Sequence, residues 1–143
     1  EQEACEIANE KILLSAMESI MSGDALHGGS AAGKGPNGLI VKRGSGGVIA
    51  MLPGGTIALP AFPTKNIVDP TGCGDSFAGS LLAHLVGRRG VLNDQDSMRS
   101  ALIHATVTAS FTLGAIGING IVNIERGPYH ARVDKYRRIV GLP

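Results

Sequence analysis

Four stretches of the chain carry apolar residues three or four positions apart, the spacing that places side chains on one face of a helix. The clearest is residues 73–86, where Phe77, Leu81 and Leu85 follow one another at intervals of four. This pattern predicts helices at residues 4–21, 73–86, from Asp96 or Ser97 to about Thr112, and 129–140, and a loop at 23–38 with a short helix near Ala25.

Short apolar runs between these helices predict β-strands. Leu39–Lys42 and Val48–Leu52 flank a glycine-rich turn, residues 43–47, and this order predicts a hairpin. A third strand is expected at residues 56–59. Strands that lie between helices in the sequence are typical of layered α/β proteins rather than of helix bundles or β-sandwiches. We therefore expect an α/β fold.

Composition excludes several classes of function. The 13 basic and 12 acidic residues give a net charge of +1, so no basic face is expected for nucleic acid or a membrane surface. Aromatic residues make up 3%, too few for the stacking platforms that bind single strands. No apolar run reaches the length of a membrane-spanning helix. Cys5 and Cys73 lack the spacing of a metal site, and a reduced, cytoplasmic location is the simplest interpretation.

Residues 69–79 carry the strongest chemical signal, Asp-Pro-Thr-Gly-Cys-Gly-Asp-Ser-Phe-Ala-Gly. An extended apolar segment, Ile67–Val68, runs into a glycine-rich turn that opens into a helix. The N–H groups at such a helix start, together with the positive end of the helix dipole, form a site for an anion. Asp75 would repel a phosphate bound there, so its expected role is to take a proton from an attacking hydroxyl. The alternative is a tight strand-to-helix connection in which Asp75 only favours the helix dipole.

Three further features each allow two interpretations. Asp69 starts the turn by accepting from its own backbone, or acts with Thr71 as an oxygen ligand to a cation. The turn at residues 44–47 is a flexible hairpin tip, or a tip without bulky side chains that lets a nucleotide approach the backbone. Residues 28–34 match the first seven positions of a P-loop, but Gly35 stands where Ser or Thr should hold magnesium, so this match is expected to be coincidental.

The motif at residues 69–79 resembles the second signature of the PfkB, or ribokinase-like, family of sugar and nucleoside kinases. The usual form of that signature is Asp-x-Thr-Gly-Ala-Gly-Asp-Ser/Ala-Phe-x-Gly, and only Cys73 departs from it. Residues 38–47 resemble the strand and nucleotide loop that lie upstream in the same family. Together with weaker matches, the resemblance spans most of residues 7–120.

The weaker matches depart from the family at positions that would carry chemistry. Residues 7–10 resemble the Asn-x-x-Glu region of the family, but Ile12 stands where the second acid is expected. Residues 109–112 are similar to a helix-to-loop segment of one branch, but residues 113–114 are Leu-Gly where a Val-Glu pair would follow. Any function of those two acids is therefore absent here.

The resemblance implies ATP-dependent phosphorylation of a sugar or nucleoside hydroxyl, with Mg²⁺ bridging the ATP phosphates. Asp75 would be the general base. The backbone N–H groups that hold the transferring phosphoryl group would be those of Gly72, Cys73 and Gly74. Because Cys73 would act only through its backbone, its thiol should be tolerated, either as a buried group or with a pKa lowered by the helix start.

The resemblance also implies which residues would lie around a monovalent cation and around the nucleotide. Asp69 and Thr71 would lie at a site for a monovalent cation such as K⁺, in members that have one. The hairpin loop and the helix at residues 97–112 would flank the adenine. The residues expected to bind the nucleotide are Lys42, Gly44, Ser45, Gly47 and His104.

The implied fold is the C-terminal, nucleotide-binding portion of a ribokinase-like three-layer α-β-α sheet, as a single domain over residues 1–143. Family members are considerably longer, and the missing half carries most of the sugar pocket and the lid. Part of the parallel sheet would lack its neighbours and leave edges or apolar surface that favour a homo-oligomer. The chain is then either the catalytic half of a kinase or a truncated, non-catalytic module that keeps nucleotide binding but lacks the acceptor pocket.

Overall fold

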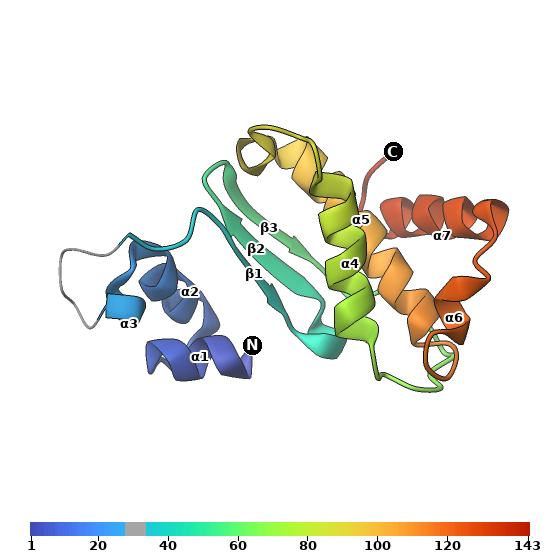
Figure 1. Ribbon diagram of the computed structural model, residues 1–143, viewed down its shortest axis with the longest axis horizontal. Helices are drawn as coiled ribbons and strands as arrows, with labels where there is room; N and C mark the ends of the chain where they lie inside the picture. The colour runs from blue at the N-terminus through green and yellow to red at the C-terminus, as the bar shows by residue number, and fades with distance from the viewer. Residues whose placement is uncertain (28–33) are drawn as a thin grey trace.

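A small antiparallel sheet forms the centre of the computed structural model, which describes residues 1–27 and 34–143 (Figure 1). Its strands lie in the order β1-β2-β3, with bounds Leu39–Lys42, Val48–Leu52 and Gly55–Leu59. The predicted hairpin and third strand are confirmed, and β3 begins one residue earlier than expected. Both strand pairs are antiparallel, so the described residues contain no part of the expected parallel sheet. The P-loop-like residues 28–33 lie outside the described residues.

Helices flank the sheet on both sides. The predicted helix at residues 73–86 is confirmed as α4, which ends one residue earlier than expected. The helix predicted to end near Thr112 is confirmed as α5, and the last helix is confirmed as α7, which starts and ends before the predicted residues. Asp94 is the N-cap of α5, in place of the predicted Asp96 or Ser97, and its side chain accepts from the amides of both. The bounds are α1 Gln2–Ala8, α2 Leu13–Ser22, α3 Asp24–His27, α4 Cys73–Leu85, α5 Gln95–Thr112, α6 Asn119–Val122 and α7 Arg126–Ile139, with single turns η1 Gly44–Gly46 and η2 Val91–Asn93.

The prediction of one continuous helix at residues 4–21 is wrong, because the first helix ends at Ala8 and a second begins at Leu13. Asn9 adopts the left-handed conformation, with φ 51° and ψ 40°. The amides of Asn9 and Glu10 donate back to the carbonyls of Glu6 and Cys5, which closes the end of α1. Asparagine tolerates this conformation better than most residues, so α1 can end at Asn9. The apolar spacing of the sequence continues past this residue, although the helix does not.

The alternation of side chains along β2 divides the core into two clusters. Val48, Ala50 and Leu52 face a large cluster built with α4, α5 and α7. Ile49 and Met51 point to the other face of the sheet, where they pack against a smaller cluster around Met17 of α2. Helices therefore cover both faces of a small sheet, and α1–α3 pack on the opposite face from the long helices.

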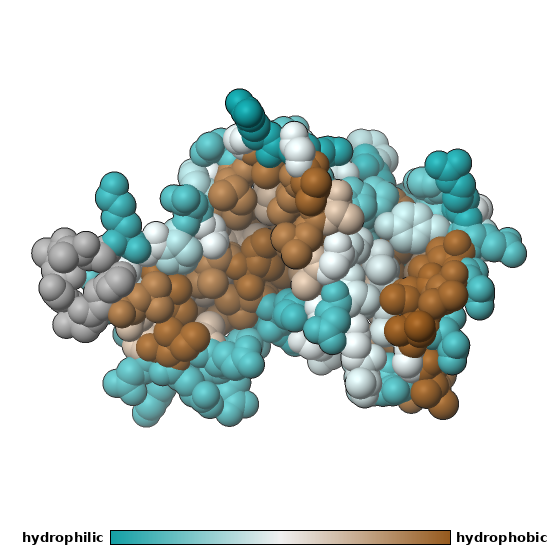
Figure 2. All heavy atoms as spheres, viewed as in Figure 1, coloured by the Kyte–Doolittle hydropathy of each residue, from teal (hydrophilic) through white to brown (hydrophobic). Residues whose placement is uncertain are grey.

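Apolar side chains also reach the surface in two regions (Figure 2). One lies over α1–α3 and the neighbouring strands, and the other lies at the α6 end of the molecule. The exposed residues of these regions are Ile7, Ile12, Leu14, Leu26, Ile116, Ile118 and Val122. Among the described residues, no helix is both long enough and apolar enough to cross a membrane.

Tyr136 of α7 is fully buried and donates its hydroxyl to the carbonyl of Pro60, which follows β3. Burial raises the pKa of Tyr136 to about 12. Because the pKa is higher in the folded state than the ordinary value of 10.0, the contribution of the neutral side chain is complete below pH 10 and is lost as the pH rises toward 12.

We therefore expect Tyr136→Phe to lower the free energy of unfolding by about 1 kcal/mol at pH 8, through the lost hydrogen bond. The difference in this free energy between the two proteins should shrink between pH 10 and 12. In that range the wild type loses stability as its unfolded tyrosine ionises, whereas the phenylalanine variant has no proton to lose at this position. Urea unfolding of both proteins at several pH values measures this difference, in which the other titrating groups cancel. Parallel pH profiles of the two proteins would contradict the expectation.

Candidate active site

The turn before α4 is held by its own aspartate. Asp69 accepts a hydrogen bond from the amide of Thr71 at 2.9 Å, and this bond holds the pKa of the Asp69 carboxyl below its usual value, with a smaller contribution from the amide of Gly117. Gly72 then turns the chain into the helix with φ 79°. Only glycine adopts that conformation freely, so the turn requires a glycine at position 72. Asp69 thus starts the turn, as one of its two interpretations predicts.

The segment before the turn is anchored to the loop that follows α5. The amides of Val68 and Asp69 both donate to the carbonyl of Leu113, at 2.9 and 3.3 Å. Ile67 and Val68 are exposed and pair with no described strand, so the connection expected from strand to helix is instead one from loop to helix. Hydrogen bonds to the carbonyl of Leu113, rather than pairing with a β-strand, therefore hold the segment that leads into the turn.

Some backbone amides at the start of α4 donate a hydrogen bond within the protein, and others have no acceptor among the described residues. The amide of Cys73 donates to the carbonyl of Pro70 at 3.2 Å, and Ser76 makes the first helical bond to Gly72. The amides of Gly72, Gly74 and Asp75 have no acceptor among the described residues. Two of the three predicted anion-binding donors are thus available. The amide of Asp75 is a further donor that the sequence analysis missed, and the amide of Cys73 would have to leave Pro70 to take part.

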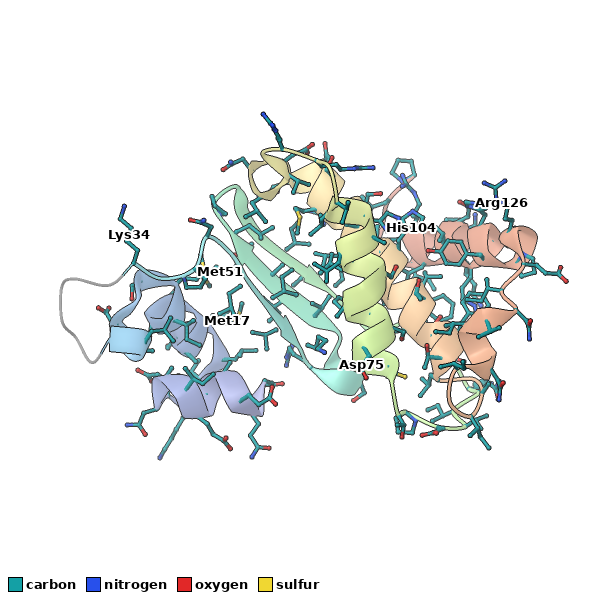
Figure 3. The ribbon with its side chains drawn as sticks, viewed as in Figure 1. Met17, Lys34, Met51, Asp75, His104 and Arg126 are labelled. Atoms are coloured by element: carbon teal, nitrogen blue, oxygen red, sulfur yellow. The ribbon has the colours of Figure 1, made fainter. Side chains whose placement is uncertain are left out.

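Asp75 lies in the first turn of α4 (Figure 3) and is exposed. It lines a groove of about 800 Å³ together with Thr71 and Gly72. The groove continues along a face of α4 made of small residues, which include Gly79. Its other walls come from α5, from the loop at residue 117 and from α6 and the start of α7. They are formed by Thr108, Thr112, Gly117, Ile118, Ile121, Ile124 and Tyr129.

The floor of the groove is the contact between α4 and α5. Hydroxyl pairs join the two helices: Thr112 donates to Ser76 at 2.8 Å, and the hydroxyl oxygens of Thr108 and Ser80 lie 3.1 Å apart in a hydrogen bond. These side chains keep the helices close while presenting little bulk to the groove. The sequence analysis did not identify them, and only the spacing of four between the two threonines and between the two serines hints at paired faces.

The hairpin loop lies beside the start of α4. Lys42, the last residue of β1, donates its Nζ to the carbonyl of Gly74 at 3.3 Å, so β1 and the turn meet at this point (Figure 1). Gly44 and Ser45 form the exposed single turn η1 directly after it. Gly47 has φ 88° and packs against the carbonyl of Leu59. Four of the predicted nucleotide-binding residues, from Lys42 to Gly47, are therefore brought next to the predicted anion site.

His104 lies toward the other end of the helix pair from Asp75 (Figure 3). Its ring stacks on His84 with centroids 4.4 Å apart, and its Nδ1 lies 2.9 Å from the hydroxyl of Tyr129. Burial lowers the pKa of His104, with smaller contributions from His84, His130 and Arg137. His104 is not among the residues described as lining the groove, and its ring contacts the groove wall through Tyr129. Its predicted contact with a nucleotide stays a prediction.

The thiol of Cys73 packs against α5, where it lies 3.6 Å from the carbonyl of Ala109. Burial raises the pKa of this thiol, and the charge of Asp69 adds to the effect. Of the two alternatives for this thiol, a pKa lowered by the helix start is therefore wrong, because burial disfavours the thiolate.

We expect Cys73 to react slowly with iodoacetamide, and its rate should still be rising at pH 9, since the thiolate is the reactive form. The Cys5→Ser variant leaves Cys73 as the sole thiol, and mass spectrometry follows its alkylation. A rate that levels off below pH 8 would show a lowered pKa and contradict this expectation.

The described residues contain no cluster of three His, Cys, Asp or Glu side chains that could hold a metal ion. Magnesium commonly binds through one or two carboxylates and the phosphates of a substrate, so a magnesium ion here would need the phosphates of a bound nucleotide among its ligands. Asp69 and Thr71 lie side by side, as the predicted monovalent-cation site requires, and that role stays untested.

Comparison with known proteins gives a family match over most of the chain. The model of the pfkB family carbohydrate kinases matches residues 1–123. No curated protein was found to match the sequence.

Solved structures of kinases are similar in fold. A fructokinase from Vibrio cholerae O395, bound to fructose, ADP and calcium ion, matches with a TM-score of 0.69 and 18% identity over 93% of this chain and 39% of its own. An aminoimidazole riboside kinase from Salmonella enterica matches with a TM-score of 0.66 and 21% identity, over 92% of this chain and 39% of its own. A nucleoside kinase from Methanocaldococcus jannaschii, an archaeal member of the ribokinase family, matches with a TM-score of 0.54 and 27% identity. This match covers 69% of this chain and 30% of the kinase. The chain thus spans between 30% and 39% of these structures.

Proposed function

The chain belongs to the pfkB family of carbohydrate kinases, and from this premise we propose that it forms the ATP-binding half of an enzyme that phosphorylates a hydroxyl group of a sugar or nucleoside. The fold proposed for the whole enzyme is the three-layer α-β-α sheet of ribokinase-like proteins. In that arrangement the antiparallel strands of this chain extend a larger sheet.

One observation carries the proposal: unbonded amides and a carboxylate meet at one end of a large groove. The free amides of Gly72 and Gly74 lie within three residues of Asp75, at a helix start whose dipole favours negative charge. Gly72 and Asp75 both line the groove. An anion and a proton acceptor are thus accommodated next to each other, which is the arrangement that phosphoryl transfer to an alcohol needs.

In the proposed mechanism Asp75 takes the proton of the acceptor hydroxyl as the hydroxyl oxygen attacks the γ-phosphorus of ATP. The bond between that phosphorus and the β–γ bridging oxygen breaks, and ADP leaves. The amides of Gly72, Gly74 and Asp75 donate to the phosphoryl oxygens and stabilise the charge that they carry in the transition state. Each such donor typically contributes about 2.7–4 kcal/mol. When Mg²⁺ is bound with the nucleotide, it neutralises part of the phosphate charge.

The nucleotide would lie between the hairpin loop and the helix pair. Lys42 would approach the phosphates, and the contact of its ammonium with the carbonyl of Gly74 supports this proposal. Gly44, Ser45 and Gly47 would border the nucleotide from the loop, and His104 would act through Tyr129 at the far end of the groove. Asp69 and Thr71 would shape the turn around a monovalent cation. A related fructokinase structure contains fructose, ADP and potassium ion.

The acceptor is proposed only as a class. The similar structures include kinases of fructose, of aminoimidazole riboside and of nucleosides. The exposed apolar residues over α1–α3 support the further proposal that this surface is covered, by another part of the kinase or by a second copy. We also propose a cytoplasmic location, since both cysteines are free thiols.

A non-catalytic role is the second candidate, and the limited coverage of the similar structures favours it. The chain spans 39% of the fructokinase, so an acceptor pocket need not be complete within it. Such a module would bind a nucleotide in the same groove and transfer nothing.

Calorimetry with ATP and a transfer assay test both candidates. ATP with Mg²⁺ should bind with a dissociation constant between about 1 μM and 1 mM, the range in which kinase substrates commonly fall. A screen of sugars and nucleosides, read as ADP release, then tests turnover. Binding with turnover supports the kinase, and binding without turnover supports the module. A folded protein that shows neither would contradict both.

A further inference from the structure

A second cavity lies on the other side of α5 from the groove. It has a volume of about 210 Å³, and none of its lining residues lines the groove. Ser110 faces this cavity, whereas Thr108 and Thr112 face the groove. Because successive residues of a helix are about 100° apart, residues two positions on lie on nearly opposite faces. The polar side chains around the cavity are those of Thr64, Asn66, Ser110 and Arg132.

Among the described residues that line this cavity, Arg132 is the only one with a charged side chain. It comes from α7, which packs beside α5 (Figure 1). Its guanidinium carbon lies 3.7 Å from the centre of the Phe111 ring and 5.4 Å from that of Phe62. Stacking engages the flat face of a guanidinium and leaves the N–H groups along its edge available. Burial lowers the pKa of Arg132, which reflects the partial loss of its hydration.

Most of these N–H groups have no protein acceptor. A guanidinium carries five donors, and one hydrogen bond is formed, from Nη1 to the hydroxyl of Ser110 at 3.2 Å. Arg132 forms no ion pair with any carboxylate of residues 1–27 and 34–143. A partly desolvated cation without a counter-ion is unfavourable, and an anion that enters the cavity would relieve that cost.

Among the neighbouring side chains, Ser110 accepts from Arg132 and Thr64 adds a free donor. The Ser110 hydroxyl donates to the carbonyl of Val107, so its oxygen is left to accept from Arg132. The oxygen of Thr64 accepts from the amide of Asn66 at 3.1 Å, and its hydroxyl hydrogen is left to donate. None of the described residues that line the cavity carries a carboxylate. The electrostatics of the cavity therefore favour a negative ligand.

We propose that this cavity binds a small oxyanion of the phosphate class, held by the edge of the Arg132 guanidinium and by the Thr64 hydroxyl. The planar fork of arginine matches two oxygens of such an ion. The cavity is smaller than the roughly 300 Å³ at which sites for drug-sized ligands begin, so it suits a phosphate group rather than a nucleotide. Gly114 and Ala115 line it and directly follow Leu113, whose carbonyl anchors the turn before α4. An occupant would thus stabilise the loop that positions the groove.

NMR titration with inorganic phosphate at constant ionic strength tests the site. The protein is first saturated with ATP and Mg²⁺, so that the amides at the start of α4 are occupied. The side-chain Nε–H signal of Arg132 and the backbone signals of residues 110–115 should then shift with phosphate. Arg132→Gln should abolish these shifts. Arg138→Gln, which removes the same charge from an exposed position on α7, should leave them unchanged.

Arg132→Lys provides a variant that keeps the charge and part of the packing if the glutamine variant does not fold. It should weaken phosphate binding at least about tenfold, because lysine cannot form the two-pronged contact. A second arm with a phosphorylated sugar shows whether the site takes the free ion or the phosphate group of a larger molecule. Equal phosphate affinities of the Arg132 and Arg138 variants, or shifts confined to residues 72–75, would overturn the proposal.

Discussion

Replacing Asp75 with asparagine should lower the rate of phosphoryl transfer by about 10²–10⁴-fold, the contribution expected of a general base. Asparagine has nearly the same shape but cannot take a proton at neutral pH. The amides of Gly72 and Gly74 are backbone groups, so the substitution leaves them in place, and ATP should bind as tightly as before or more tightly. ADP release with the acceptor found by the screen measures the rate, and calorimetry measures the binding.

Asp96→Asn is the matched control for this prediction. Asp96 is also an exposed acid in the first turn of a helix, α5, and it does not line the groove. Its replacement removes the same charge and should leave the rate unchanged. An Asp75→Asn protein as active as the Asp96→Asn protein would show that no base acts at position 75.

Gly47→Ala should destabilise the protein by about 3 kcal/mol or more. Gly47 has φ 88° and ψ −135°, a combination that only glycine adopts readily. An added Cβ would also lie 2.1 Å from the carbonyl oxygen of Leu59, well inside contact distance. Since both obstacles are backbone atoms or backbone angles, no side chain can move to relieve them. Urea unfolding measures the loss, and binding of ATP should weaken with it because the loop would be displaced.

Gly44→Ala separates the conformational effect from the clash. Gly44 also has a positive φ, 54°, but nothing lies within 4 Å of an added Cβ. The left-handed conformation alone costs alanine roughly 1–2 kcal/mol. Equal losses of stability in the two variants would mean that position 47 is not packed against β3 as described.

The sequence predicted the long helices and the hairpin because their signals are local. Phe77 and Leu81 of α4 are both buried, as the spacing of four required. The break at Asn9 was missed because a single left-handed residue leaves the apolar spacing intact. The same limit applies to Asp94, whose capping bonds to two amides depend on a turn that hydrophobic periodicity does not report.

The candidate site divides in the same way. The turn and Asp75 are contiguous in the sequence, so their motif could be recognised directly. The walls of the groove that the turn and α4 do not supply come from residues more than 30 positions away, such as Thr108 and Tyr129, and no local pattern links them to Asp75. The bond from Cys73 to the Pro70 carbonyl could not be foreseen either, because the spacing of the glycines does not report which amides the turn itself uses.

The most direct test of the central claim is to titrate the protein with ATP and Mg²⁺ and to follow the backbone amide signals at the start of α4 by NMR. The account predicts that the amides of Gly72, Gly74 and Asp75 shift together, with the affinity that calorimetry gives, and that they shift in the Asp75→Asn protein as well. Binding that saturates while these three signals stay unmoved would contradict the claim that the helix start holds the phosphate.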